Sequence, residues 1–232
     1  MPPAVAPYER EDVRRATGET LRPGGMALTE RALALCRFPA GARVLDLGSG
    51  TGATLARLRE VGLAAAGLDC SAALLAVAKA HQAPLVCGSA TALPLAGDVL
   101  DGLFCECVLS AVNQPDPMLT EIARVLRPGG LFVLTDLYLR PGPTAQAGVP
   151  GCAGGAVHQD VLLERLSRHG LVPLRFEDHT RLLADLTCRL IFELGSARQV
   201  LSMITGRDPA CSGGGARPRF GYCLVVAAKE PV

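Results

Sequence analysis

The sequence predicts an α/β fold in which helices flank a mostly parallel β-sheet. Short apolar runs alternate with stretches of helical periodicity as far as Pro141, and the first run leads into a loop with glycine at every second position. This alternation is typical of strand–helix–strand units, whose right-handed crossovers place helices on both faces of a parallel sheet. The 232-residue chain is 49% hydrophobic and 19% charged, which suits one domain with a sizeable core.

Each expected strand is a short apolar run bounded by glycine, proline or charge. The strands are expected at residues 43–47, 64–69, 85–87, 100–106, 131–135, 172–176 and 221–227. The helices are expected at residues 27–37, 53–62, 72–81, 116–126, 159–169 and 181–203. This gives an N-terminal helical lid segment, residues 1–38, and a main domain, residues 39–232, with a helical insertion near 181–203. The segment and the insertion are expected to cover the active site and exclude water.

Composition restricts the classes of partner. The formal net charge is +1, no basic stripe is present, and six Phe and three Tyr are the only aromatic residues. Nucleic acid therefore has neither electrostatic nor stacking support as a substrate, and a small molecule is favoured. The N-terminus lacks an apolar signal core and no stretch reaches membrane-spanning length, so we expect a cytoplasmic protein that does not enter the membrane. The sequence carries no signal for an oligomeric state.

The nine cysteines are spread over the chain rather than set in CxxC pairs. This spacing disfavours a structural metal site, and a cytoplasmic location disfavours a disulfide framework. Cys36, Cys70, Cys87 and Cys223 are therefore expected to be small buried hydrophobic residues.

The strongest local motif is Val44-Leu45-Asp46-Leu47-Gly48-Ser49-Gly50-Thr51-Gly52. An apolar strand ends in an acid and three alternate glycines that open a helix, so a ligand can lie against the backbone and meet free N–H groups. Asp69 ends the next strand, at roughly the 20-residue offset where an acid binds ribose hydroxyls. A tight structural turn and a helix cap are the respective alternatives, and the combination of the two motifs favours a ligand site.

Together with later segments, this motif resembles the class I S-adenosylmethionine (SAM)-dependent methyltransferases over residues 40–137. The matching segments are Gly67-Leu68-Asp69, Ala90-Thr91-Ala92-Leu93-Pro94-Leu95, Asp101-Gly102-Leu103-Phe104 and Glu121-Ile122-Ala123-Arg124-Val125-Leu126-Arg127-Pro128-Gly129-Gly130. The resemblance implies a Rossmann-like seven-stranded sheet with an antiparallel last strand, and SAM as the cofactor. It implies cofactor-binding roles for Asp46, Gly48, Ser49, Gly50, Gly52, Asp69, Cys70, Ser89, Ala90 and Glu106. Ser89 stands where the family often has Asp.

The acceptor side is similar to the arsenite methyltransferases. Glu106-Cys107-Val108-Leu109 matches an Asn-Cys-Val-Ile segment of that family, and Cys152-Ala153-Gly154-Gly155-Ala156 matches a Cys-x-Gly-Ala loop. The resemblance implies that Cys152, and less strongly Cys107, bind a thiophilic acceptor such as arsenite or a selenium or sulfur species. The family's second loop thiol is absent, and Cys188 or Cys211 is a candidate substitute. While the strand stays extended, Cys105 and Cys107 share one face and Glu106 lies on the other.

Two alternatives remain open. The first is an oxygen or carbon methyltransferase for a quinone-like or other apolar metabolite, with His158, Glu106 or Tyr138 as the base. The second is a sensor that binds SAM without turnover, because the glycine loop and Asp69 support binding rather than chemistry. Formation of S-adenosylhomocysteine distinguishes the enzyme from the sensor.

Overall fold

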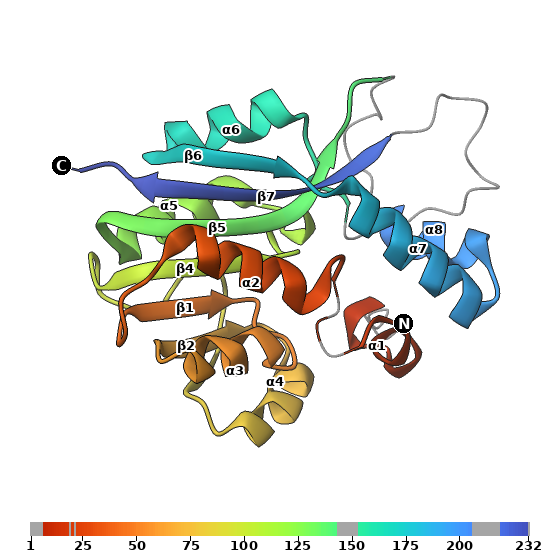
Figure 1. Ribbon diagram of the computed structural model, residues 1–232, viewed down its shortest axis with the longest axis horizontal. Helices are drawn as coiled ribbons and strands as arrows, with labels where there is room; N and C mark the ends of the chain where they lie inside the picture. Colours follow the sequence, from red (N-terminus) through yellow and green to blue (C-terminus); the bar gives the residue numbers. More distant parts are fainter. Residues whose placement is uncertain (1–6, 19, 21, 143–152, 206–218, 232) are drawn as a thin grey trace.

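A computed structural model describes residues 7–18, 20, 22–142, 153–205 and 219–231. These residues form a seven-stranded sheet in the order β3-β2-β1-β4-β5-β7-β6, with helices on both faces (Figure 1). The strands from β3 to β5 pair in parallel, whereas β7 is antiparallel to both of its neighbours. The predicted fold class, with its antiparallel last strand, is confirmed.

The first four strands have the predicted bounds and the later ones are longer. The strands are β1 Arg43–Leu47, β2 Ala64–Asp69, β3 Leu85–Cys87, β4 Leu100–Glu106, β5 Leu126–Leu139, β6 Leu171–Asp178 and β7 Phe220–Lys229. β5 and β7 form an antiparallel ladder that runs from the pair Leu131 and Ala228 to the pair Leu139 and Phe220. This ladder extends both strands beyond the apolar runs that marked them in the sequence.

The helices follow the expected order with two differences. They are η1 Pro7–Glu9, α1 Glu11–Thr17, α2 Gly25–Cys36, α3 Ala53–Glu60, α4 Ala72–Ala78, η2 Lys79–His81, η3 Leu109–Ala111, α5 Pro115–Val125, α6 Gln159–Arg168, α7 Thr180–Leu194 and α8 Ala197–Thr205. The helix α1 was not expected as a separate element. The single helix expected at 181–203 is split, because Gly195 adopts a left-handed conformation (φ 70°) that ends α7.

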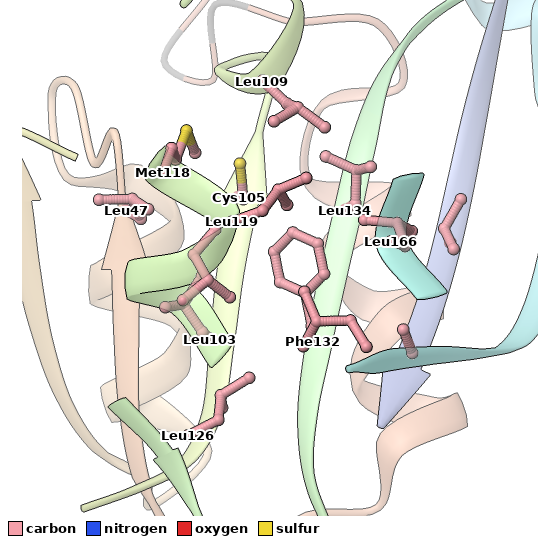
Figure 2. Close-up of a cluster of buried hydrophobic side chains, with 14 of the residues drawn as sticks. Leu47, Leu103, Cys105, Leu109, Met118, Leu119, Leu126, Phe132, Leu134 and Leu166 are labelled. Atoms are coloured by element: carbon pink, nitrogen blue, oxygen red, sulfur yellow. The ribbon is translucent and has the colours of Figure 1, made fainter. Parts of the chain in front are cut away.

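The larger core cluster lies between the sheet and the helices α5 and α6 (Figure 2). Met118 and Leu119 of α5 and Leu166 of α6 are fully buried there, together with Leu103 and Phe132 from the sheet. Full burial of one such side chain contributes about 1.5–3 kcal/mol, so this layer holds the central strands in register.

The opposite face of the sheet is covered by α2 and α3, which lie in front of the strands in Figure 1. Ala32 of α2 and Leu55 and Leu58 of α3 pack against Val44 and Phe104 of the sheet. On this face the apolar layer continues into polar side chains at the carboxyl ends of β1 and β4. Among the described residues, no helix is long and apolar enough to cross a membrane.

Candidate active site

The carboxyl ends of β1 to β4 surround a cavity of about 280 Å³, which we call the main cavity. All but one of the predicted cofactor-binding residues line it, and so does one of the two predicted catalytic thiols. These residues are Asp46, Gly48, Ser49, Gly50, Asp69, Cys70, Ser89, Ala90, Glu106 and Cys107. The chain thus gathers residues from the ends of β1, β2 and β4 and from the loops after β1 to β4, at the edge where open α/β sheets bind ligands.

The glycine loop forms the floor of the cavity. Gly48 has φ 76°, and a Cβ atom there would lie 2.2 Å from Cγ2 of Val108, so only glycine fits. Gly52 lies outside the cavity lining, at the N-cap of α3 with φ 84°, and a Cβ atom there would lie 2.9 Å from Cδ2 of His81. Glycine at position 52 thus allows the turn into α3. The predicted contact between Gly52 and the cofactor stays a prediction.

Asp69 is fixed between the glycine loop and the start of α4. Its Oδ2 accepts a 2.8 Å hydrogen bond from the Gly50 amide, and its Oδ1 accepts one of 2.8 Å from the Ser71 amide. Ser71 caps α4 by accepting a hydrogen bond from the Leu74 amide. The Asp69 carboxylate is therefore held in place by backbone donors and keeps lone pairs for the hydroxyls of a ligand.

A buried ion pair that the sequence analysis missed closes another side of the cavity. Arg22, in the turn before α2, lies 2.8 Å from Oε2 of Glu106 and also donates to the hydroxyls of Thr29 and Thr54. Thr54 in turn donates to Oε2 of Glu106 over 2.7 Å. Burial by itself lowers the pKa of Arg22, but Glu106 and further acidic neighbours outweigh burial and raise it. No local sequence pattern marks Arg22, because its partners come from α2, α3 and β4.

Asp46 shares this cluster and is 2% exposed. Burial, followed by the nearby Glu106 carboxylate, raises the pKa of Asp46 to about 8. Within the described residues, Oδ2 of Asp46, Oγ of Ser49 and two nitrogens of Arg22, Nε and Nη1, are buried without a hydrogen-bond partner. Unpaired buried polar atoms are costly, so four of them around one cavity fit a ligand that supplies polar groups.

Cys107 departs from the predicted alternation of faces. It adopts φ 59° after the end of β4, so that Glu106 and Cys107 both line the main cavity while Cys105 is fully buried in the core. The Cys107 sulfur lies 3.0 Å from the hydroxyl of Tyr222, which donates to Thr135 over 3.1 Å. Side chains alternate between faces only in an extended strand, and β4 ends at Glu106, one residue before Cys107.

The other candidates do not meet at this cavity. His158 is the N-cap of α6, and Tyr138 packs edge-on against Phe176 at 5.5 Å between ring centres; neither lines the cavity. Cys188 is exposed on α7. The predicted acceptor thiols Cys152 and Cys211 lie outside the described residues.

The expected burial of four cysteines is only partly right. Cys223 is fully buried, and Cys36 packs against the cluster beneath α2 and α3. The expectation was wrong for Cys70 and Cys87, which are exposed. Both lie at or just beyond the ends of strands, where the general tendency of free cysteine to be buried does not hold.

The part of the chain that builds the cavity matches a known domain family. Residues 45–134 match the model described as a methyltransferase domain. Over this part of its length the chain is similar to the methyltransferase domain family. Among curated proteins, the demethylmenaquinone methyltransferase of Mycolicibacterium paratuberculosis is 38% identical over 96 residues, which are 41% of this chain and 42% of that protein. The matched region thus spans about two fifths of this curated relative.

Solved structures share the fold over most of the chain. Phosphoethanolamine N-methyltransferase 2 of Haemonchus contortus, in complex with S-adenosyl-L-methionine, has a TM-score of 0.75 at 18% identity and covers 95% of this chain and 56% of that one. The [4+2]-cyclase SpnF has a TM-score of 0.73 at 22% identity and covers 90% of this chain and 82% of that one. At these identities the likeness concerns the fold, and SpnF illustrates that one fold carries different reactions.

Proposed function

We propose that this protein is a SAM-dependent methyltransferase that acts on a small molecule with a quinone-like, apolar ring. The observation that carries the proposal is the main cavity, which combines a glycine floor, a backbone-held carboxylate and a buried cluster of charges with unpaired polar atoms. The methyltransferase domain match over residues 45–134 and the methyltransferases of the same fold support it.

The residues around the cavity suit the three chemical parts of SAM. The Asp69 carboxylate would accept hydrogen bonds from the ribose diol, and Ser89 and Ala90 would lie beside the adenine. At the other end, Asp46 and Glu106 would bind the ammonium group of the methionyl part, and the unpaired Nε and Nη1 of Arg22 its carboxylate. When bound, SAM supplies an electrophilic methyl group, and the chain contributes alignment and exclusion of water.

The acceptor end of the cavity favours an apolar ring. Val108, Ala111 and Val112 line it, and the matched curated relative is a demethylmenaquinone methyltransferase. Of the three base candidates, Glu106 alone lines the cavity, and its carboxylate is held by Arg22 and Thr54, which suits cofactor binding better than proton transfer.

A thiophilic acceptor has less support. Cys107 lines the main cavity, and its sulfur contacts the hydroxyl of the fully buried Tyr222. Cys152 lies outside the described residues, and the curated relative carries the name of a quinone enzyme. Arsenite is therefore the second acceptor to test.

We also propose that the N-terminal segment closes the site. Tyr8 and Thr20 line the main cavity, and Oε1 of Glu9 accepts a 2.6 Å hydrogen bond from the Ser71 hydroxyl at the start of α4. Arg22 separates the main cavity from a second one between this segment and α7. A cover that is held at α4 and β4 would exclude water during methyl transfer.

The test is methyl transfer from SAM to a reduced demethylmenaquinone with a short side chain, with arsenite plus excess thiol in parallel. We expect S-adenosylhomocysteine and a methylated quinol from the native protein, and a large loss in Asp69→Asn. The matched control Asp178→Asn changes a carboxylate that binds Thr180 at the start of α7 and lies outside the cavity lining. Formation of methylated arsenic without methylated quinol would show that the acceptor is thiophilic rather than quinone-like. Tight binding of S-adenosylhomocysteine without turnover on either acceptor would favour the sensor.

A further inference from the structure

Two exposed cysteines occupy neighbouring positions where β2 and the edge strand β3 end. Cys70 follows the last residue of β2, and Cys87 is the last residue of the edge strand β3. In the parallel pairing of these strands, Asp69 is opposite Cys87, so the two cysteines are one position out of register. Both are exposed, unlike the fully buried Cys105 and Cys223.

The backbone spacing is suited to a disulfide bond. Neighbouring strands lie about 4.8 Å apart and rise about 3.3 Å per residue, which places Cα atoms one position out of register roughly 6 Å apart. Disulfide-linked cysteines have Cα atoms about 4.4–6.8 Å apart. The Cys87 sulfur already lies 3.8 Å from the carbonyl oxygen of Cys70.

This pair adjoins the main cavity. Cys70 lines the cavity next to Asp69, and the segment after Cys87 contributes Gly88 and Ser89 to the same wall. Within the described ranges no group of three or more His, Cys, Asp or Glu side chains is arranged to hold a metal ion. The pair therefore offers two-thiol chemistry rather than a metal site.

We propose that Cys70 and Cys87 form a dithiol site that reacts with a glutathione-type disulfide to give a reversible Cys70–Cys87 bridge. One protein thiolate attacks the glutathione disulfide, and its S–S bond breaks to release one glutathione. The second protein thiolate attacks the mixed disulfide and releases the second glutathione. Two protein thiols are oxidised, and one glutathione disulfide is reduced to two thiols.

The surroundings of the pair set the order of the two steps. Burial, followed by the Asp69 carboxylate, raises the pKa of the Cys70 thiol, so Cys70 carries less thiolate at neutral pH. Cys87 is exposed and lies outside the cavity lining, so we assign the attack to Cys87 and the resolving step to Cys70. The bridge draws the Cys70 side chain out of the cavity wall toward β3, which weakens cofactor binding; this consequence rests on the proposed function.

The bridge is tested by treating the native full-length protein with glutathione disulfide, blocking free thiols and mapping the peptides. We expect a linked peptide pair containing Cys70 and Cys87 that dithiothreitol separates. Cys70→Ser should accumulate a glutathione adduct on Cys87, because resolution is lost. Cys188→Ser, which removes an exposed thiol outside the main-cavity lining, should form the bridge like the native protein. Separate glutathione adducts on both thiols, or no linked pair, would overturn the proposal.

The effect on the site is tested by calorimetric titration with S-adenosylhomocysteine. We expect about tenfold weaker binding by the bridged form than by the reduced form. The Cys70→Ser/Cys87→Ser variant should show the same affinity with and without the oxidant. A bridge that forms without any change in this affinity would refute the idea that the bridge weakens cofactor binding. A reduced protein that does not bind S-adenosylhomocysteine would count against the proposed function, and peptide mapping would still decide the thiol pair.

Discussion

Two carboxylates that line the main cavity are held in opposite ways, and we call the parts of the cavity around them the Asp69 end and the Asp46 end. At one end, Asp69 is 7% exposed and both of its oxygens accept hydrogen bonds from backbone amides. At the other end, Asp46 is 2% exposed, retains an oxygen without a partner and shares a charged cluster with Glu106 and Arg22. The backbone thus fixes the Asp69 carboxylate in place, whereas the Asp46 carboxyl group keeps an oxygen that no protein group satisfies.

This difference indicates how each end would recognise its part of a ligand. A carboxylate fixed by backbone N–H groups offers a rigid acceptor for neutral hydroxyls at little cost of reorganisation. A cluster with unpaired polar atoms favours a ligand that brings charges of its own. With the cofactor placed as proposed, S-adenosylhomocysteine would reach both ends, whereas 5′-methylthioadenosine lacks the amino-acid part and would reach only the Asp69 end. Comparing the two ligands separates the ends.

The largest effect is expected from Arg22→Met. Loss of one partner leaves the Glu106 carboxylate buried and uncompensated, which destabilises the fold by about 3–5 kcal/mol. Denaturant unfolding measures this change. The double variant Arg22→Met/Glu106→Gln should recover much of the loss because no unpaired charge remains. Equal stability of the single and double variants would contradict the view of a coupled pair.

Gly48→Ala tests the floor between the two ends. The positive φ costs about 1–2 kcal/mol in a non-glycine residue, and the clash with Val108 adds about 1–3 kcal/mol. We expect weaker binding of both ligands. In the control Gly102→Ala, a Cβ atom would meet the ring of Phe38 at 2.4 Å, away from the cavity lining. That variant should lose stability and keep both affinities; equal losses of affinity in the two variants would argue against a direct role of the floor.

Asp69→Asn should weaken the binding of S-adenosylhomocysteine and of 5′-methylthioadenosine by the same factor. Replacing a charged hydrogen-bond acceptor with a neutral amide reduces the binding free energy by about 1.5–3 kcal/mol, which lowers the affinity roughly tenfold to a hundredfold. Calorimetric titration of the two ligands measures the loss. A variant that weakens S-adenosylhomocysteine alone would place the ribose elsewhere in the cavity.

The smallest effect is a dependence on pH that is confined to the Asp46 end. The pKa of Asp46 is raised to about 8 in the free protein, and an adjacent ammonium group favours the ionised form. Binding then releases a proton below pH 8, so the affinity for S-adenosylhomocysteine should rise about fivefold between pH 7 and pH 8. Asp46→Asn should remove this dependence, and 5′-methylthioadenosine should not show it. The same slope for both ligands would refute the assignment.

The sequence predicted the parts of the molecule that depend on local pattern. The bounds of β1 to β4 follow from short apolar runs between glycine, proline and charge, and the glycine spacing marked the floor of the cavity. Arg22 could not be found in this way, because its burial depends on Thr29, Thr54 and Glu106 from three other elements. The exposure of Cys70 and Cys87 and the turn at Cys107 were missed for a different reason. Alternation describes extended chain and fails at Cys107, which follows the end of β4. The usual burial of free cysteine takes no account of strand ends, where Cys70 and Cys87 lie.

The position of β7 has a consequence for synthesis of the chain. β7 is the only strand that connects β6 to the rest of the described sheet, and it follows both β6 and α7 in the sequence. On the ribosome, the half that contains β1 to β5 can therefore assemble while β6 still lacks a partner. A nascent chain that pauses before Phe220 leaves β6 and one edge of β5 without the partner that β7 supplies, which makes this interval the stage at which aggregation competes with folding.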